Sequence, residues 1–277
     1  MADDHEAHAR SKRTELAAFL KSRRARLQPS DVGLRGGGRR RVAGLRREEV
    51  AAVADVGLTW YTALETGSEI GVSENTLERI ADALKLDSAE RKYLLELARG
   101  IPAKVESAVS ARVREAIDAV EAPAYVISGD WNILYWNVAF AALWNAEPPG
   151  SAPFNAAESL FIDPGSRKLY AEAWESVARG VVAQIRSDYA SHIGDPVFEK
   201  TMSRLLTIPD FERFYAANEV ISSMDETVRT IQHPALGPIE IVSVNFLIPG
   251  TSLTATIELL QEGAMDRLRS YLRAKEG

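Results

Sequence analysis

The sequence contains no cysteine and only four histidines among its 277 residues. The absence of cysteine excludes disulfide bonds, thiolate zinc sites, iron–sulfur clusters and a cysteine nucleophile. No run of about eighteen apolar residues occurs, and the first residues, MADDHEAHARSKR, lack the apolar segment of a signal peptide. We therefore expect a cytoplasmic chain without a membrane span, whose stability comes from apolar burial.

The few candidate catalytic residues do not form a recognisable site. His5 and His8 lie in a stretch expected to be disordered. His233 stands at the end of an expected strand, where a structural hydrogen bond is favoured over a role as a base or haem ligand. Glu172 and Glu175 have the spacing of a solvated helix face as well as that of an acid/base pair. We expect no enzyme, no metal site and no cofactor.

Charge is distributed unevenly along the chain, although the net charge is −6. Residues 10–47 hold thirteen Lys and Arg but two acidic residues, whereas residues 101–277 hold fifteen basic and twenty-three acidic residues. A basic N-terminal region favours a polyanionic partner, with a solvated helix face and a basic loop as the alternative. The length allows two domains.

Helical periodicity dominates the first hundred residues. Residues 46–54 and 58–66 form two short helical patterns, and the first places Val50, Val53 and Ala54 on one face. They are separated by a break at residues 55–57, where Asp55 can adopt a left-handed turn conformation. In the second pattern Tyr61 and Leu64 point inward, which leaves short polar side chains on the other face. Two helices joined by a tight turn, with basic residues beside the first, are typical of a helix that enters the major groove of DNA.

This interpretation assigns residues to two kinds of DNA contact. The expected phosphate contacts are Arg39, Arg40, Arg41, Arg46 and Arg47. The expected base contacts are Thr59, Thr62 and Ala63, while Trp60 either packs at the core edge or contacts the DNA backbone. The expected partner is therefore a double-stranded DNA operator. Residues 28–41 are expected to form a flexible basic loop. Its three glycines, residues 36–38, could suggest a phosphate-binding loop, but no strand precedes them and no Lys-Ser/Thr follows.

The second half alternates between strand and helix patterns. Residues 123–145 predict a strand, a two-residue turn at Gly129-Asp130, a second strand and a helix. Four helices are expected at residues 156–161, 167–187, 196–206 and 210–217. Three strands with alternating β-branched residues follow, in ETVRTIQHP, GPIEIVSVNFLIP and SLTATIELL. This order predicts an α+β domain with an antiparallel sheet.

Several segments resemble a known family. SKRTELAAFLKSRRARLQP, GLRREEVA, WYTALE and TLERIADALKLDSAERKYLLELA are similar to the helix–turn–helix domain of Xre-type bacterial transcription regulators, in particular the MmyB-like subfamily. PAYVISGDWNILYWN resembles the start of a PAS sensory domain, and HPALG and FER resemble the MmyB-like ligand-binding domain. The resemblance implies an all-α, lambda-repressor-like domain of five helices, followed by an α+β PAS-like domain.

The domain boundaries that we expect follow from these patterns and from the break at Gly100-Ile101-Pro102. They are a disordered tail (1–10), a helix–turn–helix domain (11–100), a connecting helix (101–122, with its helical pattern at 105–120), a PAS-like domain (123–262) and a C-terminal helix or tail (263–277).

The resemblance also implies a small apolar, fatty-acid-like ligand in the second domain. Its expected walls are aromatic: Trp136, Phe140, Trp144, Phe161 and Trp174. Aromatic residues at helical spacing more often form a packed core than a ligand site, so a dimerisation or interaction module without ligand remains the alternative. A homodimer is expected, because one short recognition helix reads few base pairs.

Overall fold

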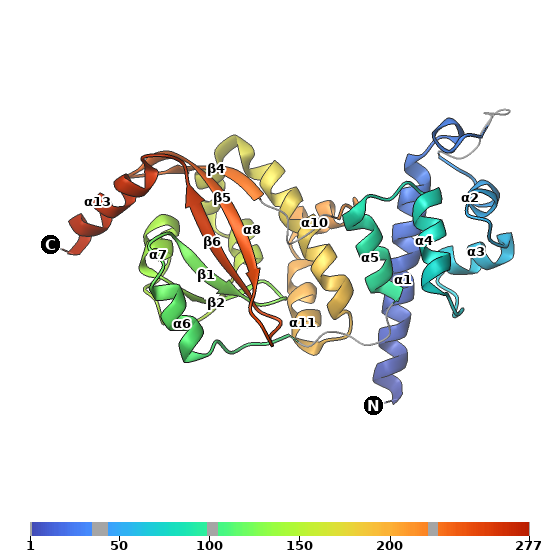
Figure 1. Cartoon of the computed structure of the whole chain (residues 1–277), viewed down its shortest axis with the longest axis horizontal. Coiled ribbons are helices and arrows are strands. Elements are labelled where there is room, and N and C mark those ends of the chain that lie inside the picture. Colours follow the sequence, from blue (N-terminus) through green and yellow to red (C-terminus); the bar gives the residue numbers. More distant parts are fainter. Residues whose placement is uncertain (1, 35–43, 99–104, 221–226, 277) are drawn as a thin grey trace. The chain divides into compact units, whose positions relative to one another are not determined.

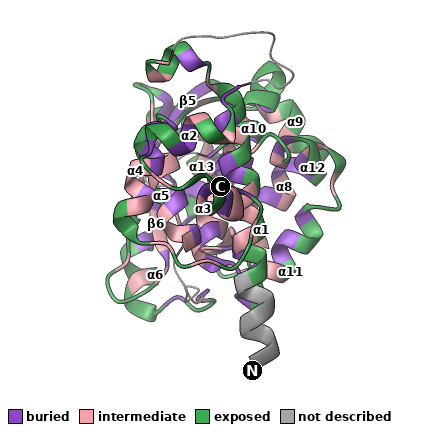
Figure 2. Ribbon diagram, turned by 90° about the vertical axis from the view of Figure 1, so that its right-hand side faces the viewer, coloured by how far each residue is buried: buried purple, intermediate pink, exposed green. Residues whose placement is uncertain are grey.

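The computed structural model of the chain describes residues 2–34, 44–98, 105–220 and 227–276. The chain divides into two compact units (Figure 1). The first comprises Met1–Pro102, Ala190–Gly194 and Asn218–Ile221, and the second comprises Ala103–Tyr189, Asp195–Ala217 and Ser222–Gly277. Buried, intermediate and exposed residues occur together along most of the helices (Figure 2). No helix within the described residues is long and apolar enough to cross a membrane.

The first unit is helical, as the periodicity predicts. Its described elements are α1 (Ala2–Arg26), a 3-10 helix (Pro29–Val32), α2 (Arg47–Val53), α3 (Leu58–Glu65), α4 (Glu74–Ala83) and α5 (Ser88–Ala98). Its core contains Leu20, Val50, Tyr61, Ile80 and Leu94, none of which is exposed to solvent. Ser73 caps α4, because its hydroxyl accepts a hydrogen bond from the backbone of Thr76.

Three details of this unit differ from the sequence prediction. Helix α1 begins at Ala2, so residues predicted to be a disordered tail continue the first helix. A single 3-10 turn, Pro29–Val32, interrupts the stretch predicted to be a loop. Val53, predicted to face the core with Val50 and Ala54, is 37% exposed at the end of α2.

The second unit contains an antiparallel sheet, which confirms the predicted α+β class. Within the described residues six strands lie in the order β3-β2-β1-β6-β5-β4. The strands are β1 (Ala124–Ile127), β2 (Asn132–Trp136), β3 (Phe154–Asn155), β4 (Thr227–His233), β5 (Gly237–Leu247) and β6 (Thr254–Leu260). The first and last strands are neighbours at the centre of the sheet (Figure 1).

Helices cover both faces of this sheet. They are α6 (Ala111–Asp118), α7 (Val138–Trp144), α8 (Ala156–Ile162), α9 (Pro164–Tyr170), α10 (Trp174–His192), α11 (Pro196–Leu205), α12 (Pro209–Tyr215) and α13 (Ala264–Glu276). Helix α6 packs on one face, where Ile117 joins a cluster with Ala124 and Val126. The opposite face, here called the inner face, meets α7 and α9.

Two predicted helices are shorter in the structure. The helix expected at residues 105–120 is formed only as α6, because Ser110 caps its first turn by accepting a hydrogen bond from Val113. The helix expected at 167–187 is two helices joined by a 3-10 turn, with Ala171 at a positive φ of 48°. This break separates Tyr170, which contacts Trp144, from Trp174, which contacts Phe161.

The predicted two-residue turn at Gly129-Asp130 is a three-residue loop. The amide of Ser128 bonds to the carbonyl of Asn132, and Trp131 adopts a left-handed φ of 68°. Asp130 is buried in this loop and accepts hydrogen bonds from the Ser128 hydroxyl and the Asn132 amide. The buried carboxylate explains the extra residue, since both donors must turn toward it.

Candidate functional site

The turn between α2 and α3 is held by local contacts. Asp55 adopts the predicted left-handed conformation, with φ 52°. Arg79 of α4 donates hydrogen bonds to the carbonyl oxygen of Asp55, at 3.0 Å, and to its carboxylate, at 3.2 Å. Gly57 is the N-cap of α3 and has no side chain to accept a capping bond. The turn therefore fixes where α3 begins.

Helix α3 presents two different faces. Tyr61 and Leu64 are buried, as predicted from their spacing. Thr59 is exposed, whereas Thr62 and Ala63 are half-buried on the side away from the core. Trp60 is also half-buried, which is compatible with both of its predicted roles. The structure thus brings the predicted base-contacting residues onto one helix with short, accessible side chains.

Glu65 anchors this helix through a contact that the sequence analysis did not identify. Its carboxylate has no exposed surface and accepts hydrogen bonds from Arg24 at 2.7 and 2.8 Å and from Arg47 at 2.9 Å. Burial alone raises the pKa of Glu65, but the bonds and charges of the two arginines outweigh it, so the pKa lies below its usual value. Glu65 lies one helical turn after Tyr61, a spacing that could have indicated burial.

The predicted phosphate contacts have different environments. The Arg46 side chain is 49% exposed, and its backbone amide is capped by Glu49. Arg47 is partly engaged, because its Nε donates to Glu65, although 41% of its side chain is exposed. Arg39, Arg40 and Arg41 lie outside the described residues. The described part of the first unit thus offers cations at the start of α2 and small polar side chains on α3.

The aromatic residues predicted to line one ligand site fall into two clusters. Trp136, Phe140 and Trp144 form a row on the inner face, with ring centroids 6.3 Å apart at each step. Phe161 and Trp174 belong to a separate core with Phe211 and Phe214. The five residues therefore do not form one wall. Trp136 is 1% exposed and bonds to the carbonyl of Glu147, so it packs in the core.

Charged and polar side chains occupy the middle of the inner face. Arg229 of β4 forms an ion pair with Glu258 of β6, whose side chain is 1% exposed. Trp144 of α7 donates its indole N–H to the same carboxylate at 2.6 Å, and the Arg229 guanidinium lies 5.3 Å from the Trp144 ring centroid. Ser243 of β5 lies directly opposite Glu258 in the sheet. None of Arg229, Ser243 and Glu258 was identified from the sequence.

Two tyrosines adjoin this ion pair. Burial, aided by the charge of Glu258, raises the pKa of Tyr125, and burial raises the pKa of Tyr170 to about 12. Burial also raises the pKa of Glu258, against the opposing charge of Arg229. We name these six residues the inner-face cluster: Tyr125, Trp144, Tyr170, Arg229, Ser243 and Glu258. Such a cluster can bind a polar group between aromatic rings.

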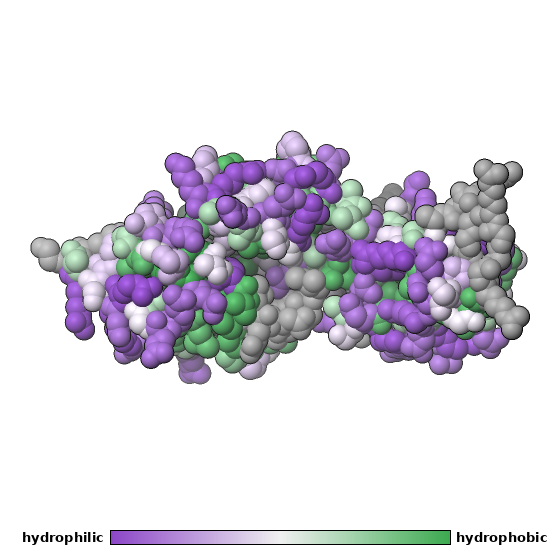
Figure 3. Space-filling model, turned by 90° about the horizontal axis from the view of Figure 1, so that it is seen from above, coloured by the Kyte–Doolittle hydropathy of each residue, from purple (hydrophilic) through white to green (hydrophobic). Residues whose placement is uncertain are grey.

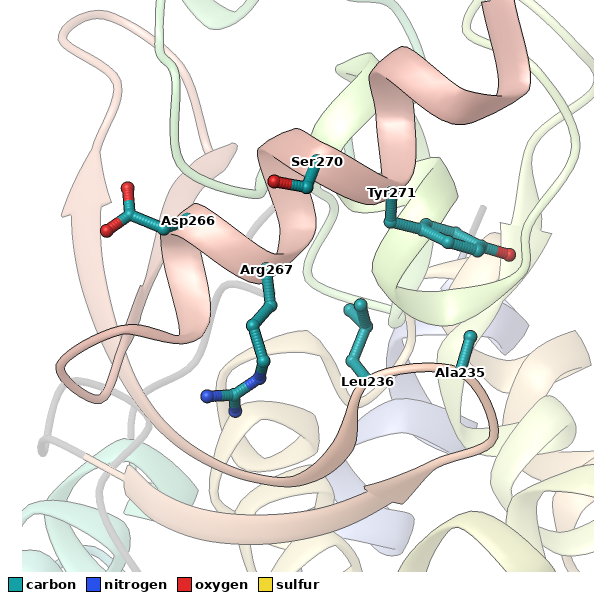
Figure 4. A pocket seen from close by; sticks show the side chains of 6 residues that line it. All are labelled: Ala235, Leu236, Asp266, Arg267, Ser270 and Tyr271. Carbon is teal, nitrogen blue, oxygen red and sulfur yellow. The ribbon is translucent and has the colours of Figure 1, made fainter.

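A shallow depression lies elsewhere, between the β4–β5 turn and α13 (Figure 4). It measures about 520 Å³, is open to solvent and contains none of the predicted site residues. His233 lies beside it, and its Nδ1 accepts hydrogen bonds from the amides of Ala235 and Leu236 at 3.1 and 3.0 Å. His233 therefore has the structural role expected from the sequence. Within the described ranges no group of three acidic or His residues is placed to hold a metal.

Comparison with known families agrees with both units. A helix–turn–helix domain family matches residues 15–94. The family described as the MmyB-like transcription regulator ligand binding domain matches residues 109–269, more than half of the chain. No curated protein matches the chain. These regulators bind DNA and a small molecule and are not enzymes. With its helical pair, its six-stranded α+β unit and both matches, the chain belongs to the MmyB-like transcription regulators.

Proposed function

We propose that this ligand-responsive regulator recognises a specific operator through α3, responds to a small apolar, fatty-acid-like molecule and acts in the cytoplasm as a homodimer. The accessible face of α3 carries this proposal, because Thr59, Thr62 and Ala63 can approach base edges and thymine methyl groups. Arg46 and Arg47 at the start of α2 supply charge for phosphate contacts.

Selection of binding sites from random double-stranded DNA tests the operator part of the proposal. We expect the purified chain to enrich one symmetric sequence. Substituting Thr62 should change which bases are enriched, because a base contact carries sequence information whereas a phosphate contact does not. Recovery of no preferred sequence by the folded protein would contradict sequence-specific binding.

The ligand part rests on the aromatic row of the inner face. Phe140 and Trp144 lie beside Tyr125 and Tyr170, with ring centroids 5.0 Å apart for Tyr125 and Phe140 and 6.1 Å for Trp144 and Tyr170. Tyr125, Trp144 and Tyr170 are half-buried and keep accessible surface. These rings suit an apolar body, and the neighbouring ion pair suits a polar end. We accordingly place the ligand at Phe140 and Trp144, and leave Phe161 and Trp174 to the packed core.

Titration with eight-carbon amphiphiles tests this part. A bound ligand should change tryptophan emission, because Trp144 belongs to the site, and should raise the melting temperature with increasing ligand concentration. The variant Trp144→Phe should lose most of the emission change. Trp131→Phe should keep it, because Trp131 bonds to Asp188 and packs against the separate core that contains Phe161 and Trp174. No effect on emission or melting would favour an interaction module without ligand.

The homodimer part rests on apolar side chains on the outer face of β4, β5 and β6. Val228, Val242 and Leu259 lie side by side in the sheet, and Val228 and Leu259 are 62% and 51% exposed. Phe246 is exposed on the same face of β5. A space-filling view shows hydrophobic surface gathered over this sheet (Figure 3). We name Val228, Val242, Phe246 and Leu259 the outer strip and propose a second copy of the chain as its occupant, since two recognition helices are needed for two half-sites.

A further inference from the structure

Two buried polar atoms on the inner face have no hydrogen-bond partner among the described residues. They are Nε of Arg229 and Oγ of Ser243. Ser243 is 4% exposed and faces Glu258 across the β5–β6 pair. Arg229 stands on β4 opposite Ile241, which is two residues from Ser243 along β5. Both atoms therefore belong to the inner-face cluster, on β5 and β4, the two strands that follow β6 and its Glu258 in the sheet order.

Buried polar atoms in folded proteins are nearly always hydrogen-bonded, because desolvation without a bond is unfavourable. Two such atoms in one cluster indicate a group that completes their bonds when it is present. Both can donate, Arg229 through Nε–H and Ser243 through its hydroxyl. A ligand oxygen that accepts hydrogen bonds matches both.

The charge of the cluster selects among ligand oxygens. Glu258 already neutralises Arg229, and its side chain is 1% exposed. A carboxylate ligand would bring a second negative charge beside Glu258 in a poorly solvated place, where like charges repel strongly. An ester, amide or hydroxyl oxygen accepts the same two hydrogen bonds without added charge.

We propose that the polar end of the ligand is a neutral oxygen acceptor bound by Arg229 and Ser243, and that the free carboxylate is the weaker ligand. This inference rests on the proposed function, since it assigns the head group of the apolar molecule that the second unit binds. It defines the ligand class as neutral amphiphiles such as fatty-acid esters and amides or long-chain alcohols.

The first test compares methyl octanoate, 1-octanol and octanoate on the full-length protein at pH 7 by calorimetry. The ester and the alcohol should bind at least about tenfold more tightly than the acid, which is ionised at this pH. Equal or tighter binding of octanoate would overturn the inference and leave the proposed apolar ligand intact. Binding of none of the three probes would overturn the proposed ligand function itself, and this inference with it.

The second test uses the variants Glu258→Gln and Ser243→Ala. Glu258→Gln keeps an acceptor for Trp144 but removes the negative charge, so the preference should invert and octanoate should bind more tightly than the ester. Ser243→Ala should weaken ester binding several-fold and keep the order of the probes. An unchanged ester-to-acid ratio in a folded Glu258→Gln variant would overturn the inference. If the Glu258→Gln variant does not fold, as judged by circular dichroism, the Ser243→Ala variant is the deciding test. An unchanged affinity of Ser243→Ala for the ester would then overturn the inference.

Discussion

Glu65 illustrates how one side chain can fix the position of a functional helix. It lies at the end of α3, fully buried, and joins α1 through Arg24 and α2 through Arg47. Arg24 also donates to the carbonyl of Leu45 at 2.6 Å, just before α2. Three helices are thus tied at one carboxylate, and its loss leaves the buried Arg24 without a counter-charge.

Substituting Glu65 by Gln should destabilise the first unit by about 3–5 kcal/mol, the usual cost of removing one partner from a buried ion pair. Urea denaturation of the full chain measures this effect. Glu48→Gln is the matched control, because that side chain is 59% exposed, and it should change stability by less than about 0.5 kcal/mol. Equal effects of the two substitutions would contradict the structural role of Glu65.

Stability should also depend on pH through Glu65. Its pKa is below the usual value in the folded state, so the stability that it contributes is fully present above the unfolded pKa of about 4.3. That contribution is lost as the pH falls through the lower, folded pKa. Melting temperatures measured from about pH 7 to pH 3 should therefore fall more steeply for the wild type than for Glu65→Gln. Parallel curves would show that protonation of Glu65 is not linked to unfolding.

Helical spacing predicted that Tyr61 and Leu64 of the first unit are buried, because apolar side chains on one face of a helix pack toward the core. The inner-face cluster could not be predicted in this way. In β6 the alternation of Ala255 and Ile257 with Thr256 and Glu258 favours polar side chains in solvent. In the structure both faces of β6 are covered, since Ala255 and Ile257 pack in the α6 cluster and Glu258 is buried on the inner face. The burial of the Glu258 carboxylate is explained by its partners Arg229 on β4 and Trp144 on α7.

At the scale of elements, two glycines before α2 and α3 have opposite requirements. Gly44 adopts φ +82°, and an added Cβ would lie 2.5 Å from the carbonyl oxygen of Arg24. Gly57 has an ordinary φ of −66° at the N-cap of α3, and an added Cβ would meet only the Trp60 Cβ, at 3.9 Å. One position needs glycine, whereas the other lacks a capping side chain.

The variant Gly57→Ser should therefore stabilise the protein by a few tenths of a kcal/mol, about 0.3, because serine can accept a hydrogen bond from the first turn of α3. Gly44→Ala should destabilise it by about 1–3 kcal/mol through backbone strain and the close approach to α1. Thermal melts of both variants measure the contrast. A destabilising Gly57→Ser would mean that the N-cap of α3 is constrained by a contact that the structure does not contain.

The proposed division of labour between α2 and α3 predicts different effects on DNA binding. Arg46→Ala should weaken binding to all sequences and lower the log–log salt slope by about one, since one phosphate contact is lost. Thr62→Ala should change sequence preference with little effect on the slope. Binding affinities measured at several salt concentrations distinguish the two effects. Arg112→Ala, which removes an exposed arginine of α6, is the control for charge alone. An Arg46→Ala variant that behaves like this control would place the phosphate contacts elsewhere.

Element boundaries in the second unit were predicted less well than element types. Residues 167–187 have continuous helical propensity, but the helix is interrupted at Ala171, so that the Tyr170 ring contacts Trp144 whereas the Trp174 ring contacts Phe161. Such a break depends on tertiary packing and leaves no local signal. The two-residue strand β3 was missed because Phe154 and Asn155 pair only with β2.

At the scale of the whole molecule, the sheet of the second unit separates two roles. Its inner face carries the cluster proposed to bind the ligand, and its outer strip is proposed to bind a second copy. The two faces share strands β4, β5 and β6, in which successive side chains alternate between them. Binding of the ligand and binding of a second copy would therefore involve the same three strands.

Charging the outer strip should separate the dimer. Leu259→Glu places a carboxylate among Val228 and Val242, so it should yield a monomer and weaken operator binding by tenfold or more, because both half-sites, about 34 Å apart, are no longer bound together. Ile162→Glu in α8 is the matched control, since Ile162 is exposed to a similar degree outside the strip, and it should remain dimeric. Light scattering and operator binding measure both variants. A wild type that is monomeric, both free and on DNA, would contradict the dimer, and a dimeric Leu259→Glu would move its interface away from the outer strip.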